Sequence, residues 1–552
     1  MDGYTIVLII LLAWFVILFL GQKLKFWEKI HAAPYGPFLM FKTVRGRNFI
    51  ERLARRARFW TLYGRVSIGI TIGSMVTLML LMIWEAFLVL GIPASAAPAP
   101  ETLIGIPGIN PLIPLWYGIL GLIVAVVAHE FAHGIVSRVG KIKVQSLGVL
   151  LLVVPMGAFV EPDEDEIKAA DMSIRTRLYA AGPATNMIIA LICLLAIVLV
   201  VAPSAQTVHD GAVVTGIASD SPASHFSLST WSEVINVDGA AITDPSQLRN
   251  ITFNSPGEEV NVTLIYNGQE STMQLPAGVV VLSVTGSLPA FNVGITPGMI
   301  IAELNGTPIC NISGFQKTVE TAPHDIPINI TVLKYGYDAT RGKNWFIPDN
   351  NITKITLTTK WRYFFTYNPS ENKEEYRNIS YMGITTSYAG ETSSLFGARF
   401  SQPGIVIDAY ATPFRGGNLF RDSISLIALP FLGYTPVEGP IASLYEPTGI
   451  FASLPADVFW VTLNSLYWIF WINLMVGLTN ALPAVPLDGG YVFRDLLKGL
   501  VLRTRKPSNG LDKVVEKPMT DEELDKMIRV VSLVISLFVL FLFVWQIIVP
   551  RL

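Results

Sequence analysis

Long runs of apolar residues are the feature that most restricts how this chain can fold. A helix needs about 20 apolar residues to cross a bilayer, and six runs approach or exceed that length, at 4–21, 68–92, 112–139, 178–202, 457–482 and 527–549. Hydrophobic residues make up 51% of the 552 residues and charged residues only 15%, which is outside the range of soluble proteins. We therefore expect a polytopic α-helical membrane protein with about six transmembrane helices.

The distribution of Lys and Arg predicts how the chain is oriented. Residues 23–65 are rich in basic side chains, whereas 93–111 contain none. Because basic loops stay in the cytoplasm, alternation places 140–177 and 499–526 inside and the polar region 203–455 outside. The net charge of −2 gives no indication of a nucleic-acid partner. We expect a multi-pass integral membrane protein, in the plasma membrane if the source is prokaryotic.

The polar region carries a second signal for this orientation. It contains all seven Asn-x-Ser/Thr glycosylation acceptors of the chain, at Asn250, Asn261, Asn305, Asn311, Asn329, Asn351 and Asn378. Acceptors of this kind are used outside the cytoplasm, although a region rich in Asn and Thr would contain them anyway. Cys193 lies in an apolar run and Cys310 in the polar region, so neither a disulfide nor a cysteine metal site is expected.

A metal-binding motif, His129-Glu130-x-x-His133, lies inside the apolar run 112–139. Histidines at i and i+4 project from one face of a helix and can share a Zn²⁺ ion, and Glu130 is placed to act on the water that such an ion binds. Ionisable side chains are costly inside a membrane and are usually functional there. We predict that His129 and His133 bind one catalytic zinc ion and that Glu130 is the catalytic base, toward the cytoplasmic side.

A catalytic zinc site takes three protein ligands and keeps one position open. The candidate for the third ligand is Asp488, which follows the fifth apolar run. Pro483 and Pro486 interrupt the helix before it, and Gly489-Gly490 allow sharp backbone turns, so that the carboxylate can approach the metal. The alternative is that Asp488 only caps the helix that follows.

These motifs, together with Gly182-Pro183-x-x-Asn186 in the run between them, resemble the site-2 protease family of intramembrane zinc metalloproteases. The resemblance implies hydrolysis of single-pass membrane proteins within their transmembrane segments, in regulated intramembrane proteolysis. It also implies that Asn186, and with it Asn480, hydrogen-bonds the substrate backbone or the developing oxyanion. A contact between helices is an equally open role for such an Asn.

The stretch 146–160 is rich in Val and Leu, has Pro155 and Gly157 at its centre and is too short to cross the membrane and return as helix. It predicts a membrane-dipping β-hairpin and is similar to the hairpin that the site-2 protease family places beside its active site. The edge of such a hairpin can pair with an unwound substrate strand.

An internal repeat occupies the polar region. Alternating apolar residues precede Asp238-Gly239 and again precede Asn305-Gly306, which is 67 residues later, and this pattern predicts two copies of a strand with a tight turn. The copies resemble tandem PDZ domains, which bind extended peptide at a sheet edge. Two β-rich spacers without a ligand are the alternative.

The predicted fold is thus a helical membrane core with an extracytoplasmic α+β insertion of two PDZ-like domains. The expected parts are 1–111 (first helices and a basic loop), 112–203 (first part of the catalytic core), 204–280 and 281–360 (the PDZ-like domains), 361–455 (a membrane-adjacent segment), 456–500 (second part of the core) and 501–552. Expected partners are single-pass membrane substrates, a peptide or substrate ectodomain at the PDZ-like domains, and the bilayer. A metal or solute transporter and an inactive PDZ-bearing scaffold are the competing functions.

Overall fold

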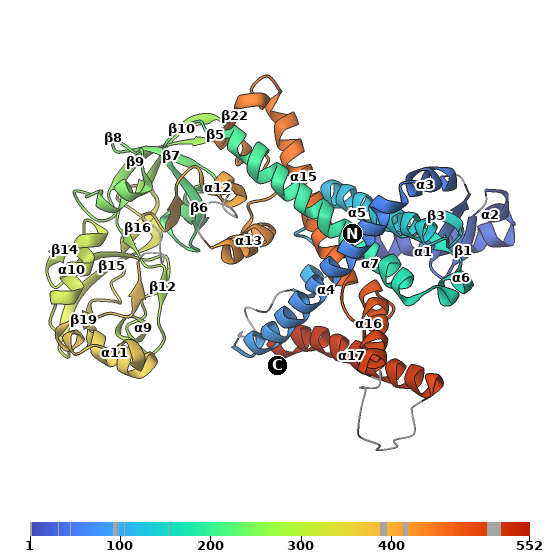
Figure 1. The fold of residues 1–552 in the computed structure, drawn as a ribbon. Helices are drawn as coiled ribbons and strands as arrows, with labels where there is room; N and C mark the ends of the chain where they lie inside the picture. Colours follow the sequence, from blue (N-terminus) through green and yellow to red (C-terminus); the bar gives the residue numbers. More distant parts are fainter. Residues whose placement is uncertain are drawn as a thin grey trace, which may run out of the picture. The chain divides into compact units, whose positions relative to one another are not determined.

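The computed structural model describes residues 3–551 except 31, 45, 92–96, 98, 104, 153, 387–394, 412–417 and 505–519. The chain forms two compact units (Figure 1). The membrane unit comprises Met1–Val200, Pro430–Pro436 and Val461–Leu552, and the insertion unit comprises Val201–Leu429 and Val437–Trp460.

Within the described residues, five helices are long and apolar enough to cross a bilayer, namely α4 (Ala57–Leu88), α5 (Leu115–Val139), α7 (Met172–Ala196), α15 (Ala456–Asn480) and α17 (Asp521–Ile548). They correspond to the second to sixth predicted runs, which confirms the prediction of several membrane-spanning helices. The first predicted run lies in α1 (Gly3–Lys23), of which Leu12–Lys23 forms a shorter apolar helix within the described residues. The sixth span therefore stays a prediction.

Helix α7 lies at the centre of the membrane unit. It packs against α4, α5 and α16 (Asp488–Thr504). Its Ala180, Ala181 and Ala184 are fully buried, and the Thr71 hydroxyl of α4 donates to the Ala180 carbonyl at 3.1 Å. Helices in hydrocarbon associate through close packing and interhelical hydrogen bonds rather than through the hydrophobic effect. Small residues on α7 are therefore what allows three helices to approach it.

Two glycines bring α15 against its neighbours in the same way. A Cβ atom on Gly121 of α5 would lie 2.7 Å from the Trp468 carbonyl oxygen, and one on Gly477 of α15 would lie 3.1 Å from the Pro183 carbonyl oxygen of α7. A side chain at either position would push the helices apart. The end of α15, which leads to Asp488, is thus fixed beside the histidine-bearing helix.

The predicted hairpin is present and belongs to a larger sheet. Strands β3 (Val144–Leu152) and β4 (Val154–Pro162) pair antiparallel. Two further strands, β1 (Ala32–Tyr35) and β2 (Phe38–Thr43), extend the sheet in the order β1-β2-β3-β4, with Leu39 opposite Leu151. These strands fall in the stretch that the sequence analysis interpreted only as a basic loop. Because β2 pairs with β3, the edge of the hairpin that no described strand covers is that of β4.

Short helices complete the membrane unit around the sheet. They are α2 (Phe26–Lys29), α3 (Arg47–Ala54) and α6 (Glu164–Ala169). Ile50 of α3 is fully buried in a cluster with Ile135 of α5 and with Val144, Leu147 and Val160 of the hairpin. This cluster fixes β4 against the helix that carries the two histidines.

The insertion unit confirms the internal repeat. Three pairs of elements are each 67 residues apart: α8 (Pro222–His225) and α9 (Pro289–Asn292), β7 (Glu233–Val237) and β13 (Ile300–Leu304), and β8 (Ala240–Ala241) and β14 (Thr307–Pro308). Asp238 and Gly239 have φ of 51° and 88°, and Asn305 and Gly306 have φ of 49° and 78°. Two left-handed residues in succession form the two-residue turn that best joins twisted antiparallel strands.

Each repeat forms a sheet of its own. The first sheet has the order β10 (Gln269–Pro276), β9 (Glu259–Tyr266), β7, β6 (Ala212–Ile217) and β21 (Ala398–Ser401). The second has the order β11 (Val279–Val280), β13, β15 (Pro327–Asp338) and β16 (Lys343–Pro348), beside a pair formed by β12 (Ser283–Val284) and β20 (Ile384–Thr385).

The expected boundaries of the repeats need correction, because both repeats are completed by later strands. β21 pairs with β6, and Phe396 and Phe400 are buried in the core of the first repeat. β20 pairs with β12, and Met382 is buried in the core of the second. The described parts of 380–401 are therefore not part of a separate membrane-adjacent segment, and the repeats are nested, since the second is completed before the first.

The rest of the predicted segment 361–455 is mostly helical. It contains α11 (Lys360–Tyr367), α12 (Ile405–Ala411), α13 (Leu419–Ile427) and α14 (Leu429–Leu432). Contact of the last two helices with a membrane surface stays a prediction. Strand β5 (Ala205–Thr207) then pairs with β22 (Tyr445–Pro447), with Thr207 opposite Tyr445, so the insertion begins and ends at one short ladder.

This ladder predicts where the insertion can be removed. Replacing residues 208–444, which include the short segment Pro430–Pro436 of the membrane unit, by a two-residue Asn-Gly turn joins β5 directly to β22. We expect the shortened protein to bind metal like the full chain and to melt within a few degrees of it. Removing only 207–360 leaves β20 and β21 without their partner strands and should cause aggregation. Metal content, thermal melting and size-exclusion profiles of the two variants check this. Equal behaviour of both would contradict the nested arrangement.

Candidate metal centre

Three of the predicted site residues meet in the membrane unit. The Nε2 atoms of His129 and His133 are 3.1 Å apart, and the Asp488 Oδ2 atom lies 3.0 Å from the first and 3.2 Å from the second. Both histidines are 7% exposed. Among the described residues, these three side chains form the one cluster of potential metal ligands that can hold an ion.

The size and chemistry of this triangle fit a tetrahedral ion. Ligand atoms about 2.0 Å from zinc at tetrahedral angles lie about 3.3 Å from one another, which is close to the three observed distances. Two imidazole nitrogens and one carboxylate oxygen are also a donor set that catalytic zinc uses, with a fourth position left for water or substrate. The three side chains therefore fit zinc.

Helix α7 orients both imidazoles from behind. The His133 Nδ1 atom lies 2.8 Å from the Leu178 carbonyl oxygen, and a carbonyl can only accept. Nδ1 therefore carries the proton and Nε2 is free to bind metal, which is the usual arrangement for a ligating histidine. This carbonyl left no signal in the sequence, because any residue at 178 supplies one.

Asn186 makes the matching contact with His129. Its side-chain Nδ2 lies 3.3 Å from His129 Nδ1, and its buried Oδ1 has no partner. Rotating the amide by 180° lets Oδ1 accept the Nδ1–H of His129, which satisfies the buried oxygen and leaves Nε2 free for metal. The structure thus places Asn186 behind a histidine. Asn480 is the half-buried last residue of α15, and within the described part of the chain it makes no hydrogen bond with the triangle.

Gly182 is a requirement of the site that the sequence analysis did not predict. A Cβ atom on Gly182 would lie closer than 3.0 Å to the Nε2 atoms of both histidines, which is the space where a metal ion has to sit. Position 182 therefore has to be glycine for a reason unrelated to backbone conformation. The Gly-Pro motif was visible in the sequence, but its consequence appears only once α5 and α7 are packed.

The turn before Asp488 also requires glycine, because two backbone segments approach each other closely there. A Cβ atom on Gly489 would overlap the Ala481 carbonyl group, and one on Gly490 would lie 2.6 Å from the Val485 nitrogen. Neither glycine has a positive φ. Glycine is therefore required here by the close approach of the backbone and not by the sharp turns expected from the sequence. Residues 481–487 fold back over the first turn of α16, and this brings Asp488 to the histidines.

Glu130 does not belong to the triangle. Its carboxylate Oε2 accepts a hydrogen bond from the backbone N–H of Val160 in β4, at 2.9 Å. The side chain is half-buried. The predicted base thus reaches from α5, the helix that carries the two histidines, to strand β4.

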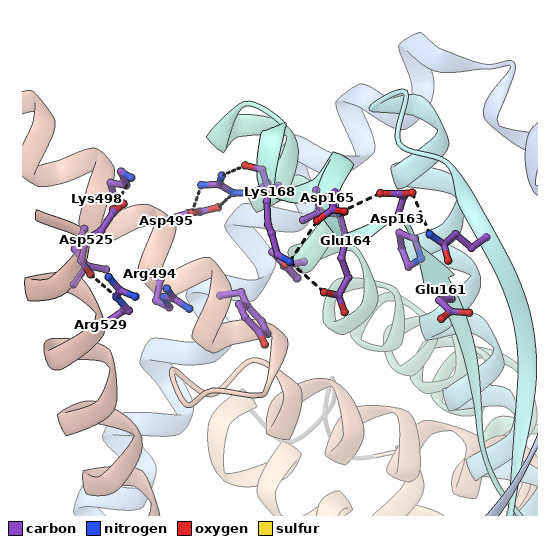
Figure 2. A pocket seen from close by; sticks show the side chains of 17 residues that line it. Glu161, Asp163, Glu164, Asp165, Lys168, Arg494, Asp495, Lys498, Asp525 and Arg529 are labelled. Carbon is purple, nitrogen blue, oxygen red and sulfur yellow. Dashed lines mark hydrogen bonds and ion pairs between the residues drawn. The ribbon is translucent and has the colours of Figure 1, made fainter. Parts of the chain in front are cut away.

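An open cavity of about 1000 Å³ lies beside the site (Figure 2). One wall carries Glu161, Asp163, Glu164 and Asp165, and the other wall carries basic and acidic residues of α16 and α17. A hydrogen bond from Ser146 and the Lys42 ammonium hold the pKa of Glu161 below its ordinary value, and the Glu166 backbone N–H does the same for Asp163. These two carboxylates are therefore ionised at neutral pH, and the cavity wall that carries them is charged.

Two stacked rings of the cavity wall lie close in sequence to residues of the metal group. Tyr179 and Tyr491 line the cavity, with ring centroids 4.6 Å apart. Tyr179 follows the Leu178 carbonyl that holds His133, and Tyr491 lies three residues after Asp488. Beside them, Arg175 of α7 forms a bidentate ion pair with Asp495 of α16, the shorter contact being 2.8 Å, which ties together the two helices that frame the site.

Comparison with known proteins agrees with this geometry. The family model described as peptidase family M50 matches residues 117–516, from α5 past α16. This chain belongs to peptidase family M50. It is a member of a family of membrane metalloproteases, and the predicted resemblance to site-2 proteases is confirmed at that level.

One curated relative of this M50 peptidase is an uncharacterized protein of Methanocaldococcus jannaschii. It is 35% identical over 193 residues, which are 34% of this chain and 50% of the relative. The chain thus matches about half the length of that relative. The similarity supports the family assignment and carries no information on substrate.

The space at Gly182 yields a test of the centre. Gly182→Ala places a methyl group between the Nε2 atoms that would hold a metal ion, so we expect it to lose at least about tenfold in metal affinity, the loss that even an indirect disturbance of a metal site causes. Asp488→Asn should show the same loss. Metal content after dialysis, measured by mass spectrometry, checks both.

Gly73→Ala is the matched control, because a Cβ atom at this position of α4 meets no other atom within 4 Å. Alanine is also the better helix former, so this variant should keep its metal and its melting temperature. Full metal content in Gly182→Ala would contradict the assignment of the triangle as the metal centre.

Proposed function

We propose that this M50 peptidase is a zinc-dependent endopeptidase that hydrolyses peptide bonds in the transmembrane segments of single-pass membrane proteins. The observation that carries the proposal is the triangle formed by buried His129 and His133 and half-buried Asp488 between apolar helices. Donors of this kind are costly in such a place unless they bind an ion. The ion is zinc, and each of the three side chains supplies one ligand atom.

Zinc, when bound, lowers the pKa of a coordinated water and polarises the scissile carbonyl. The side chains of this chain supply the remaining functions. Glu130 accepts the proton of the attacking water and passes it to the leaving nitrogen. The charged cavity beside Tyr179 and Tyr491 supplies the water. The Leu178 carbonyl and Asn186 hold the two imidazoles in the tautomers that ligation needs.

The open edge of β4 receives the substrate. A peptide bond inside a helix is shielded by its own hydrogen bonds, so a transmembrane substrate has to unwind before it can be cut. Among the described strands, β4 has one partner, β3, and its other edge adjoins Glu130. An unwound substrate segment that pairs with this edge exchanges its helical hydrogen bonds for sheet bonds and lies beside the metal group.

The second repeat of the insertion unit screens substrates as a PDZ-like domain. A groove of about 340 Å³ lies between α10 (Ile312–Thr321) and the chain at 379–386. On one side of this chain segment, the carbonyls of Gly383 and Thr385 accept hydrogen bonds from the backbone N–H groups of Thr285 and Leu282, respectively. Because backbone groups alternate along a strand, the N–H and C=O of Ile384 face the other side, where an extended peptide can pair.

In the first repeat, a hydrogen bond crosses the place that corresponds to this groove. The Gln402 side chain donates to the Asp244 carboxylate at 2.6 Å, which links the end of β21 to the start of the short helix η6 (Pro245–Asn250). We therefore assign peptide binding to the second repeat. The predicted extracytoplasmic position of this unit places the screening on the side opposite to the catalytic centre.

The competing functions fit less well. A transporter that passes metal along its path needs further sets of ligands, whereas the described residues hold one set. An inactive scaffold would not need to keep Glu130 and an intact triangle. Hydrolysis remains the function that uses every group of the site.

The proposed chemistry depends on one carboxylate. In Glu130→Gln, cleavage of a single-pass substrate in detergent should fall by about 10²- to 10⁴-fold, the contribution of a general base, while the protein keeps its metal. Gel analysis of the fragments with and without chelator measures this. Glu85→Gln, at an exposed acidic position of the spanning helix α4, is the control and should cleave normally. Unchanged cleavage in Glu130→Gln would disprove the mechanism.

The proposed screening depends on the groove of the second repeat. Gln316 lines the groove and is exposed, whereas Lys317, the next residue of α10, does not line it. Gln316→Trp should fill the groove and reduce cleavage of a substrate that keeps its ectodomain by several-fold, with no effect on a substrate without one. Lys317→Trp should change neither. An equal loss with both substrates would contradict a screening role.

A further inference from the structure

The contact between Glu130 and Val160 joins the predicted base to the predicted substrate-binding edge. Val160 lies in β4, opposite Leu147 of β3, and donates its backbone N–H to the Glu130 carboxylate at 2.9 Å. A donor that bonds a residue of α5 points away from β3. It therefore belongs to the open edge of the sheet.

This N–H has two possible acceptors once a substrate arrives. In a strand, the backbone groups that face one edge recur at every second residue, so the open edge of β4 offers the groups of Ala158 and Val160. A substrate strand that pairs along this edge takes the Val160 N–H with one of its own carbonyls. Glu130 already holds that donor, so the two acceptors compete for it.

Packing decides which partner moves. The Val160 side chain is buried against α5, where a Cβ atom on Gly134 would lie 3.0 Å from its Cγ1 atom, and it shares a core cluster with Ile50 and Leu147. The strand is therefore held in place relative to α5. Glu130, whose side chain is half-buried, is the group that can leave.

We propose that the backbone N–H of Val160 positions Glu130 until a substrate strand pairs with β4, and that pairing releases the carboxylate for catalysis. This inference rests on the proposed function. The resting hydrogen bond turns the Glu130 carboxylate toward β4. When a substrate carbonyl takes the N–H, Glu130 is free to face the attacking water.

The chemical step then balances as ordinary amide hydrolysis. An O–H bond of the attacking water breaks, and its proton goes to Glu130. The water oxygen bonds to the carbonyl carbon, the C–N bond breaks, and Glu130 returns the proton to the leaving nitrogen. Pairing thus makes the base available only when a peptide bond is in position to be cut.

Three variants of β4 separate this role from a structural one. Val160→Pro removes the N–H at an edge position, where proline is tolerated. Ala158→Pro removes the other N–H of the same edge, which Glu130 does not use. Val160→Ala keeps the N–H and removes only the core contact. Each is tested on a single-pass substrate and on a short fluorogenic peptide that spans only the scissile bond.

We expect Val160→Pro to cleave the short peptide several-fold faster than the unmodified protein and the single-pass substrate about tenfold more slowly. Ala158→Pro should slow only the single-pass substrate, and Val160→Ala should retain the normal ratio of the two rates. A parallel loss on both substrates in Val160→Pro, with Val160→Ala normal, would overturn the proposal, because the N–H would then only hold Glu130 in its working position.

Hydrogen–deuterium exchange of the full chain tests the contact without any turnover. Peptides that cover β4 should exchange faster in Glu130→Ala than in the unmodified protein, and adding the single-pass substrate to Glu130→Ala should restore their protection. Exchange that is indifferent to Glu130→Ala would overturn the proposal even if Val160→Pro failed to fold. If the unmodified protein cuts no substrate while exchange responds to Glu130→Ala, the proposed function fails and the contact stands.

Discussion

The whole membrane unit depends on bringing three polar metal donors together between apolar helices. Both histidines are buried there, so each needs neighbours that hold it in one state. Helix α7 provides them without contributing a ligand. Its Leu178 carbonyl and Asn186 amide orient the imidazoles, and Gly182 leaves the space between their Nε2 atoms empty of side chain.

The sequence predicted those parts of the site that depend on local spacing. The two histidines share a helix face whatever surrounds them, and a broken helix before Asp488 pointed to the third donor. Residues that act through packing could not be found in this way. Gly182 matters because α7 crosses α5 at that point, and Val160 matters because of a backbone N–H that every residue other than proline has.

The fold shows the same division between features with a local sequence pattern and features that depend on distant packing. Apolar runs, the hairpin and the repeat have local patterns, and the structure contains all three. Strands β1 and β2 were missed because the basic residues around them dominated the interpretation of that stretch. Strands β20 and β21 are two and four residues long, too short for an alternating pattern, and their pairing depends on partners far away in the chain.

The nested order of the repeats has a consequence for how the insertion forms. The chain leaves the ribosome with β6 long before β21, so the first repeat cannot complete its sheet until the second has been synthesised in full. Contacts between residues distant in sequence also form slowly, because closing a long loop costs entropy. The insertion should therefore assemble from the inside outward. The second repeat is completed first, when β20 pairs with β12. The first repeat follows when β21 pairs with β6, and the pairing of β5 with β22 comes last.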